Sequence, residues 1–352
     1  MSSLDRVKAG EFLSATLDVD SEFVGGEWQL QSGISFQLRA RGVLKIEPTV
    51  TSPTTKSIVV SSGVHGDETG PIELLDQLSK EILKGDFKPV HRLLFIIAHP
   101  TATLAHTRFI TENMNRLFAS HNEPTNIDRE TANVLQQEVD LFYQGGDMLN
   151  PKEENLLRWH LDLHSAIRDS THYTFAVSPH STCPTRSNAL FAFLEQAKVE
   201  AVLLSRTDSP TFSWYSAAKH GAQALTMELG RVAKIGENEL ERLLPFDTAL
   251  RELLHHYDQA YDWQGDKLVV YKVTRTLTKE TDDFQFSFPA SQANFTFFEQ
   301  GCLLGQDQDK KYFSLEGGEA VVFPNPNVAI GQRACLLVQQ TDVVAEGQIQ
   351  VI

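Results

Sequence analysis

Through residue 262 the chain alternates between compact apolar runs and segments whose apolar residues recur at helical spacing. Residues 72–82 show the helical spacing, which begins beside Pro71 and stops at Gly85. Runs rich in β-branched and other apolar residues are typical of strands buried on both faces. The predicted strands of this kind are Ile58–Val60, 91–100, 158–164, 173–177, 200–205 and 221–230.

Two further helices are expected, at Ser187–Ala197 and at Glu237–Tyr261, with Pro245 breaking or bending the second. The first fifty residues are predicted to form short strands. Strands that alternate with helices indicate an α/β fold, with a mixed, mostly parallel sheet flanked by helices.

The pattern changes near Lys267, where short β-rich runs separated by Gly, Pro, Asn and Asp replace the helical segments. We therefore predict two domains, and a chain of 352 residues is long enough for both. Residues 1–262, with the short strands of 1–50 included, would form the larger domain. Residues 263–352 would form a smaller C-terminal β-rich domain.

A His and an acidic residue stand in the gap between the predicted strand at Ile58–Val60 and the helix that follows it. His65 and Glu68 lie in GVHGDETGP, where flanking glycines permit a sharp turn. Such a turn can aim both side chains at one point, and imidazole with carboxylate is a normal pair of zinc ligands. The alternative is a solvent-exposed pair on a loop.

Two later strands carry polar residues that extend this hypothesis. His164 ends one predicted strand, and Asp162 lies two residues earlier on the same face, where it can accept a hydrogen bond from a metal-bound His. Glu228 ends another strand, and a carboxylate there is suited to take the proton of a water in a hydrolytic zinc site. The alternatives are a water-facing Asp and His, and a Glu paired with a nearby cation.

Composition narrows the possible partners. A net charge of −15 argues against a broadly basic nucleic-acid surface, and no apolar stretch reaches the length of a membrane span. Three distant cysteines and the absence of a secretory signal pattern predict a cytoplasmic protein. An anionic substrate would need its own cations in so acidic a chain, and Arg108, Arg116 and Arg168 are the candidates.

Taken together, GVHGDETGPIE, RFITENMNRLF, LDLHSA and TMELG resemble the zinc-dependent aspartoacylase and succinylglutamate desuccinylase family, which is related to zinc carboxypeptidases. RGVLKIEP, LDLHSAIRDS and TFSWYSAAKHG are most similar to its succinylglutamate desuccinylase branch. The resemblance implies a zinc-carboxypeptidase-like catalytic domain and one zinc ion per subunit. His65, Glu68 and His164 match the family's zinc ligands, and Glu228 matches its general base.

The resemblance also implies substrate contacts. Arg108 matches the Arg that polarises the scissile carbonyl, and Asn115 with Arg116 matches the pair that binds a substrate carboxylate. Tyr215 and Lys219 stand near the place where aspartoacylases carry a Tyr and an Arg, although the spacing is one residue short and Lys replaces Arg.

The reaction implied is hydrolysis of N-succinyl-L-glutamate to succinate and L-glutamate in arginine catabolism, with attack by a zinc-bound water and Glu228 as base. An aspartoacylase-like deacylase of other N-acyl amino acids and a zinc carboxypeptidase are alternatives. A non-catalytic metal-binding or interaction protein is a further one. The partner expected is a small anionic N-acyl amino acid, without nucleic acid or membrane, and the subunit is a possible homo-oligomer.

Overall fold

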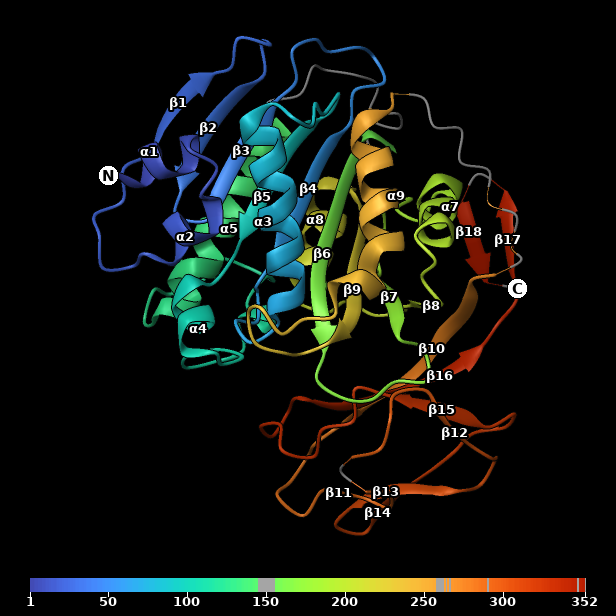
Figure 1. The fold of residues 1–352 in the computed structure, drawn as a ribbon. Helices are drawn as coiled ribbons and strands as arrows, with labels where there is room; N and C mark the ends of the chain where they lie inside the picture. The colour runs from blue at the N-terminus through green and yellow to red at the C-terminus, as the bar shows by residue number, and fades with distance from the viewer. Residues whose placement is uncertain are drawn as a thin grey trace.

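A large mixed sheet runs through the protein and carries helices on both faces (Figure 1). The structure is a computed structural model that describes residues 1–144, 156–257, 263, 265, 267–289, 291–346 and 348–351. Within these residues, 13 strands pair in one sheet. In spatial order they are β1 (Gly26–Gln29), β2 (Ser35–Ala40), β3 (Val43–Glu47), β5 (Arg92–Ile97), β4 (Ser57–Ser62), β6 (Arg158–Ala166), β9 (Gln223–Arg231), β7 (Thr174–Ser178), β8 (Ala201–Leu204), β10 (Val269–Thr278), β16 (Arg333–Gln340), β15 (Glu319–Val322) and β12 (Thr296–Phe298).

The centre of this sheet is mainly parallel, as predicted. Strands β5, β4, β6 and β9 run parallel to one another, β7 is reversed against β9, and β7, β8 and β10 are again parallel. The outer strands on both sides pair antiparallel. The carboxyl ends of β4, β6 and β9 therefore meet at one edge, where α/β sheets hold their sites.

Two hydrophobic clusters hold the helices on opposite faces of the sheet. Strand β4 shows the division, because Ile58 and Val60 belong to one cluster and Val59 to the other, as the two-residue period of a strand requires. Helices α3, α7 and α9 pack on the first face, and α5 and α8 on the second. The helices are α1 (Ser3–Lys8), α2 (Phe12–Leu17), α3 (Thr69–Lys84), α4 (Pro100–Ala105), α5 (Ile127–Gln144), α7 (Asn188–Gln196), α8 (Phe212–His220) and α9 (Leu244–His255), with short 3₁₀ segments η1 (Met114–Arg116) and η2 (Leu240–Leu243).

The helix predicted after Pro71 is confirmed as α3. Pro71 lies in its first turn, and Gly85 ends it with a left-handed φ of 80°. The prediction of strands throughout residues 1–50 is wrong at the start, because residues 3–17 form α1 and α2. Ser2 and Asp5 cap α1 reciprocally, and Phe12, the first residue of α2, is fully buried.

Pro245 does not break a long helix but stands in the first turn of α9, after η2, where a missing N–H is tolerated. The end of the predicted 237–261 helix, at 258–261, lies outside the described residues, as does residue 262 at the predicted domain boundary. Among the helices of the described ranges, none is long and apolar enough to span a membrane.

The C-terminal residues form the predicted β-rich domain. A second small sheet contains β11 (Gln285–Phe286), β13 (Leu303–Asp307) and β14 (Lys310–Phe313), and a hairpin contains β17 (Val343–Glu346) and β18 (Gln348–Val351). Strand β10 continues the main sheet by pairing with β8, so this domain is fixed to the larger domain by backbone hydrogen bonds. In Figure 1 strands β11 to β15 lie beyond the ends of β6 and β9, and the β17–β18 hairpin lies beside α7.

Candidate active site

Two His and one Glu converge at the carboxyl ends of β4 and β6. The ligand atoms of His65, Glu68 and His164 all lie within 4.8 Å of one another, and their side chains are buried. His65 and Glu68 come from the turn between β4 and α3. Gly66 permits that turn, because a Cβ there would lie 2.2 Å from the carbonyl carbon of Ala102.

The two imidazole rings face Glu68 with the same nitrogen, Nδ1. His65 Nδ1 lies 2.9 Å from Glu68 Oε1, and His164 Nδ1 lies 2.7 Å from Glu68 Oε2. On the far side of each ring, His65 Nε2 donates to Asn113 Oδ1 at 2.9 Å, and His164 Nε2 donates to Asp162 Oδ2 at 3.0 Å. Asn113 Oδ1 also accepts from the Asn115 N–H at 3.0 Å, which identifies it as oxygen.

This arrangement fits a divalent metal ion. Because Nε2 of His65 donates a hydrogen bond, Nδ1 of the neutral ring carries a lone pair and is an acceptor. This nitrogen lies 2.9 Å from Glu68 Oε1, which is also an acceptor. Two acceptors this close need a cation between them. Burial and then Arg108 lower the pKa of His65 to about 4, so the ring is neutral at pH 7. Two neutral imidazole nitrogens and a carboxylate are a normal ligand set for zinc in hydrolytic sites.

In the metal-free protein the surroundings of His164 favour a proton on the corresponding nitrogen. Burial opposes its charge, but Asp162 and Glu68 hold the pKa of His164 well above its usual value. Burial likewise opposes the charge of Glu68, and His65 and His164 hold the pKa of that carboxyl well below its usual value. A metal ion would replace this proton and neutralise the same carboxylate.

Support for the ligands extends one layer further. Asp162 is fully buried, and its Oδ1 accepts from Ser61 Oγ at 2.6 Å. Ser61 Oγ also lies 2.9 Å from His160 Nε2, whose Nδ1 contacts Ser216 Oγ at 2.7 Å. Hydrogen bonds of this kind fix the tautomer and ring orientation of a metal-bound His.

Glu228 lies beside this cluster. Strand β9 pairs parallel to β6 with Glu228 opposite His164, and both side chains line the same cavity. Burial and then the charge of Glu68 raise the pKa of Glu228 to about 7. A carboxylate with a pKa near neutrality can both accept and release a proton at pH 7.

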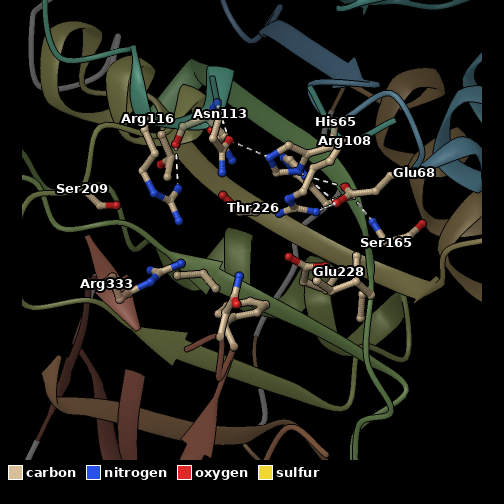
Figure 2. A pocket seen from close by; sticks show the side chains of 18 of the residues that line it. His65, Glu68, Arg108, Asn113, Arg116, Ser165, Ser209, Thr226, Glu228 and Arg333 are labelled. Atoms are coloured by element: carbon tan, nitrogen blue, oxygen red, sulfur yellow. Dashed lines mark hydrogen bonds and ion pairs between the residues drawn. The ribbon is translucent and has the colours of Figure 1, made fainter. Parts of the chain in front are cut away.

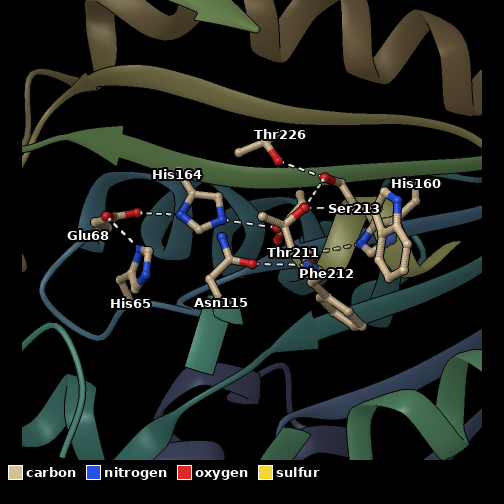
Figure 3. A network of polar contacts seen from close by, with 12 residues as sticks. His65, Glu68, Asn115, His160, His164, Thr211, Phe212, Ser213 and Thr226 are labelled. Atoms are coloured by element: carbon tan, nitrogen blue, oxygen red, sulfur yellow. Dashed lines mark hydrogen bonds and ion pairs between the residues drawn. The ribbon is translucent and has the colours of Figure 1, made fainter. Parts of the chain in front are cut away.

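The three predicted arginines all line this cavity, and Figure 2 shows two of them, Arg108 and Arg116. Arg108 NH1 lies 2.6 Å from Glu68 Oε1, which places its guanidinium beside the ligand cluster. Asn115 lines the cavity too, and its Oδ1 accepts from the Phe212 N–H at 2.9 Å, so the amide NH₂ is its available donor (Figure 3).

The structure does not bring Tyr215 and Lys219 to the cavity. The Tyr215 hydroxyl donates to Asp140 Oδ1 at 2.7 Å, and Lys219 Nζ contacts Asp140 Oδ2 at 2.6 Å. Neither side chain lines the cavity, because both contact Asp140 on α5, and Tyr215 is buried in the hydrophobic cluster that α5 and α8 share. Their contact with substrate stays a prediction that the geometry does not support.

Among the cavity residues that were not predicted, two bear directly on the site. Asn113, which accepts from His65, lies two positions before Asn115 in the segment that carried the Arg and Asn predictions. Arg333 enters from β16 of the C-terminal domain. No local pattern in the sequence marks either residue, since each acquires its place through contacts with distant segments.

Comparison with known proteins agrees with this fold, and the relatives that it finds are hydrolases. Residues 54–254 match the sequence model of the succinylglutamate desuccinylase/aspartoacylase catalytic domain, and residues 266–341 match the AstE/AspA barrel-sandwich hybrid domain. The chain belongs to the succinylglutamate desuccinylase/aspartoacylase family.

Similar proteins share nearly its whole length. The succinylglutamate desuccinylase of Vibrio parahaemolyticus is 50% identical over 328 residues, which are 93% of each chain. A crystal structure of the Vibrio parahaemolyticus protein superposes with a TM-score of 0.89 at 48% identity, covering 97% of this chain and 98% of that one. The succinylglutamate desuccinylase structure from Chromobacterium violaceum has a TM-score of 0.81 at 31% identity, with 94% and 98% covered.

Proposed function

We propose that this protein is a zinc-dependent amide hydrolase that cleaves N-succinyl-L-glutamate to succinate and L-glutamate. The observation that carries this proposal is the convergence of His65, Glu68 and His164 beside a buried Glu228. Full-length similarity to proteins named succinylglutamate desuccinylase supports the choice of substrate.

Zinc held by His65, Glu68 and His164 would supply Lewis-acid polarisation and would lower the pKa of a bound water toward neutrality. Glu228 takes the proton of the attacking water as the water oxygen bonds to the amide carbon. It then delivers that proton to the amide nitrogen, whose bond to carbon breaks. The oxygen of the water ends in the new carboxylate of succinate, and the proton that Glu228 transfers ends on the amine of glutamate.

Cationic and amide side chains hold the substrate. Arg108 lies beside Glu68, within reach of a carbonyl oxygen placed at the ligand cluster, and there it stabilises the negative charge that develops on that oxygen. Arg116 and the free amide group of Asn115 line the same cavity and can bind a carboxylate. Arg168 is a further cation of the lining.

A small substrate is favoured by the C-terminal domain. Its residues Asn294, Phe323, Asn325 and Arg333 line the cavity, with Arg333 at the end away from His65 and Glu68 (Figure 2), so the C-terminal domain covers that end of the site. An extended peptide would need that end open. The reaction fits a cytoplasmic pathway of arginine catabolism through succinylated intermediates, and the three free cysteines agree with a reducing compartment.

The test compares N-succinyl-L-glutamate with N-acetyl-L-aspartate, using wild-type protein and Glu228→Gln with the zinc content of both measured. We expect a clear preference for the succinyl compound, and loss of turnover in Glu228→Gln with about one zinc retained per chain. Chelation should abolish turnover and added zinc should restore it. Preference for the acetyl compound would contradict the substrate, and full activity of Glu228→Gln would contradict the base.

A further inference from the structure

Two guanidinium groups from different domains point into the same part of the cavity. Arg116 comes from η1 in the catalytic domain, and Arg333 is the first residue of β16 in the C-terminal domain. Figure 2 shows both side chains directed into the cavity, at the end away from His65 and Glu68. The second arginine therefore reaches the site only because the C-terminal domain docks there.

The C-terminal strands hold Arg333 firmly in this place. Residues Ala334 to Val338, which follow it in β16, are buried in the core of the domain. Backbone pairing of Arg333 with Thr278 of β10 fixes the start of the strand. The guanidinium lies over the ring of Phe323, with its carbon 5.5 Å from the ring centroid, and this contact limits the rotamers available to it.

Neither guanidinium has a carboxylate partner in the part of the chain that the structure describes. The carboxylates of the lining are Glu68, which is engaged by His65, His164 and Arg108, and Glu228. Arg116 donates to the backbone carbonyl of Asn115, which carries no net charge. Burial, and then the charges of Arg333 and Arg108, lower the pKa of Arg116 to about 9.

Two unpaired cations that repel each other in a partly buried cavity are unfavourable unless an anion binds between or beside them. A guanidinium offers planar, paired donors that match a carboxylate, so each group suits one carboxylate. Among the described residues neither arginine forms an ion pair that would stabilise the fold. Their arrangement is instead suited to a ligand with two neighbouring carboxylates.

We propose that Arg333 binds the side-chain carboxylate of the glutamate moiety, while Arg116 and Asn115 bind its α-carboxylate, so that the C-terminal domain selects a dicarboxylic amino acid. This inference rests on the proposed function. The two carboxylates of glutamate lie on one side of the scissile amide, whereas the succinyl carboxylate lies on the other. Neighbouring cations at one end of the cavity therefore match the amino-acid moiety.

N-succinyl-L-glutamine provides the discriminating substrate, because it replaces only the side-chain carboxylate by a neutral amide of nearly the same shape. For Arg333→Gln we expect kcat/KM for N-succinyl-L-glutamate to fall roughly 100-fold, as charge-assisted hydrogen bonds are lost. Turnover of N-succinyl-L-glutamine should change by less than about threefold, and that turnover also reports that the variant is folded.

Lys311→Gln serves as the matched control, since it removes one positive charge from an exposed position of the same domain. It should leave the ratio of the two substrates unchanged. An equal loss on both substrates in Arg333→Gln, or no loss on either, would overturn the role of Arg333 while the proposed function stands. Failure of the wild-type protein to hydrolyse N-succinyl-L-glutamate would instead overturn the proposed function, and this inference with it.

Discussion

Replacing Glu228 by Gln should stabilise the metal-free protein, and the gain should depend on pH. Glu228 has a pKa of about 7 in the folded chain, against an ordinary value of 4.5, first because of its burial and then because of Glu68. One pKa unit corresponds to about 1.4 kcal/mol, so the folded state carries a penalty of about 3 kcal/mol once Glu228 is ionised. Gln resembles the protonated carboxyl and avoids that penalty.

The sign follows from proton binding. Between pH 4.5 and about 7 the folded state binds the Glu228 proton more tightly than the unfolded state, so wild-type stability falls as pH rises through this window. The advantage of Glu228→Gln should therefore be about 3 kcal/mol at pH 8.5 and about 1 kcal/mol at pH 5.5. Bound zinc favours the carboxylate and should shrink the advantage at both pH values.

Urea unfolding of chelator-treated proteins, followed by tryptophan fluorescence at the two pH values, measures this difference. Glu237→Gln is the matched control, because Glu237 is exposed, and its effect should be near zero at both pH values. A difference between wild type and Glu228→Gln that does not change with pH would refute the reasoning. A less stable Glu228→Gln variant at pH 8.5 would refute it as well.

Two further variants test the hydrogen bond that orients His164 and the buried ion pair of Glu319 in the C-terminal domain. Asp162→Asn removes the charge that orients His164 and should weaken zinc affinity about 10- to 100-fold, measured by competition with a chromogenic chelator; unchanged affinity would contradict that orienting role. Glu319 is fully buried and contacts Arg275 at 2.7 Å and the Leu315 N–H at 3.0 Å. Glu319→Ala should therefore destabilise the protein by about 3 kcal/mol in thermal or urea unfolding, and an unchanged midpoint would count against this account.

The ligand cluster was predictable because its signals are local. His65 and Glu68 follow a compact apolar strand directly, and His164 and Glu228 end strands of the same kind. Parallel strands bring such ends to one edge of a sheet, so side chains at the ends of neighbouring parallel strands were expected to lie close together. The helix after Pro71 was predictable for the same reason, since its spacing and its terminal Gly85 are both visible in the sequence.

The features that were missed depend on distant contacts. The helices at residues 3–17 are short, and they are held by a reciprocal cap and by packing of Phe12 against the core rather than by a long periodic pattern. Tyr215 lies near the expected place in sequence, but its hydroxyl donates a hydrogen bond to Asp140, which lies 75 residues earlier in the chain. Arg333 reaches the cavity only through the docking of β10 on β8.

The central claim is that His65, Glu68 and His164 jointly hold one divalent ion. Anomalous diffraction at the zinc edge, on crystals of the zinc-loaded protein, tests it directly. We predict one peak per chain, about 2.0–2.2 Å from Nδ1 of each His and from a Glu68 oxygen. A peak at another place, or zinc bound in solution with no density between these three side chains, would contradict the account.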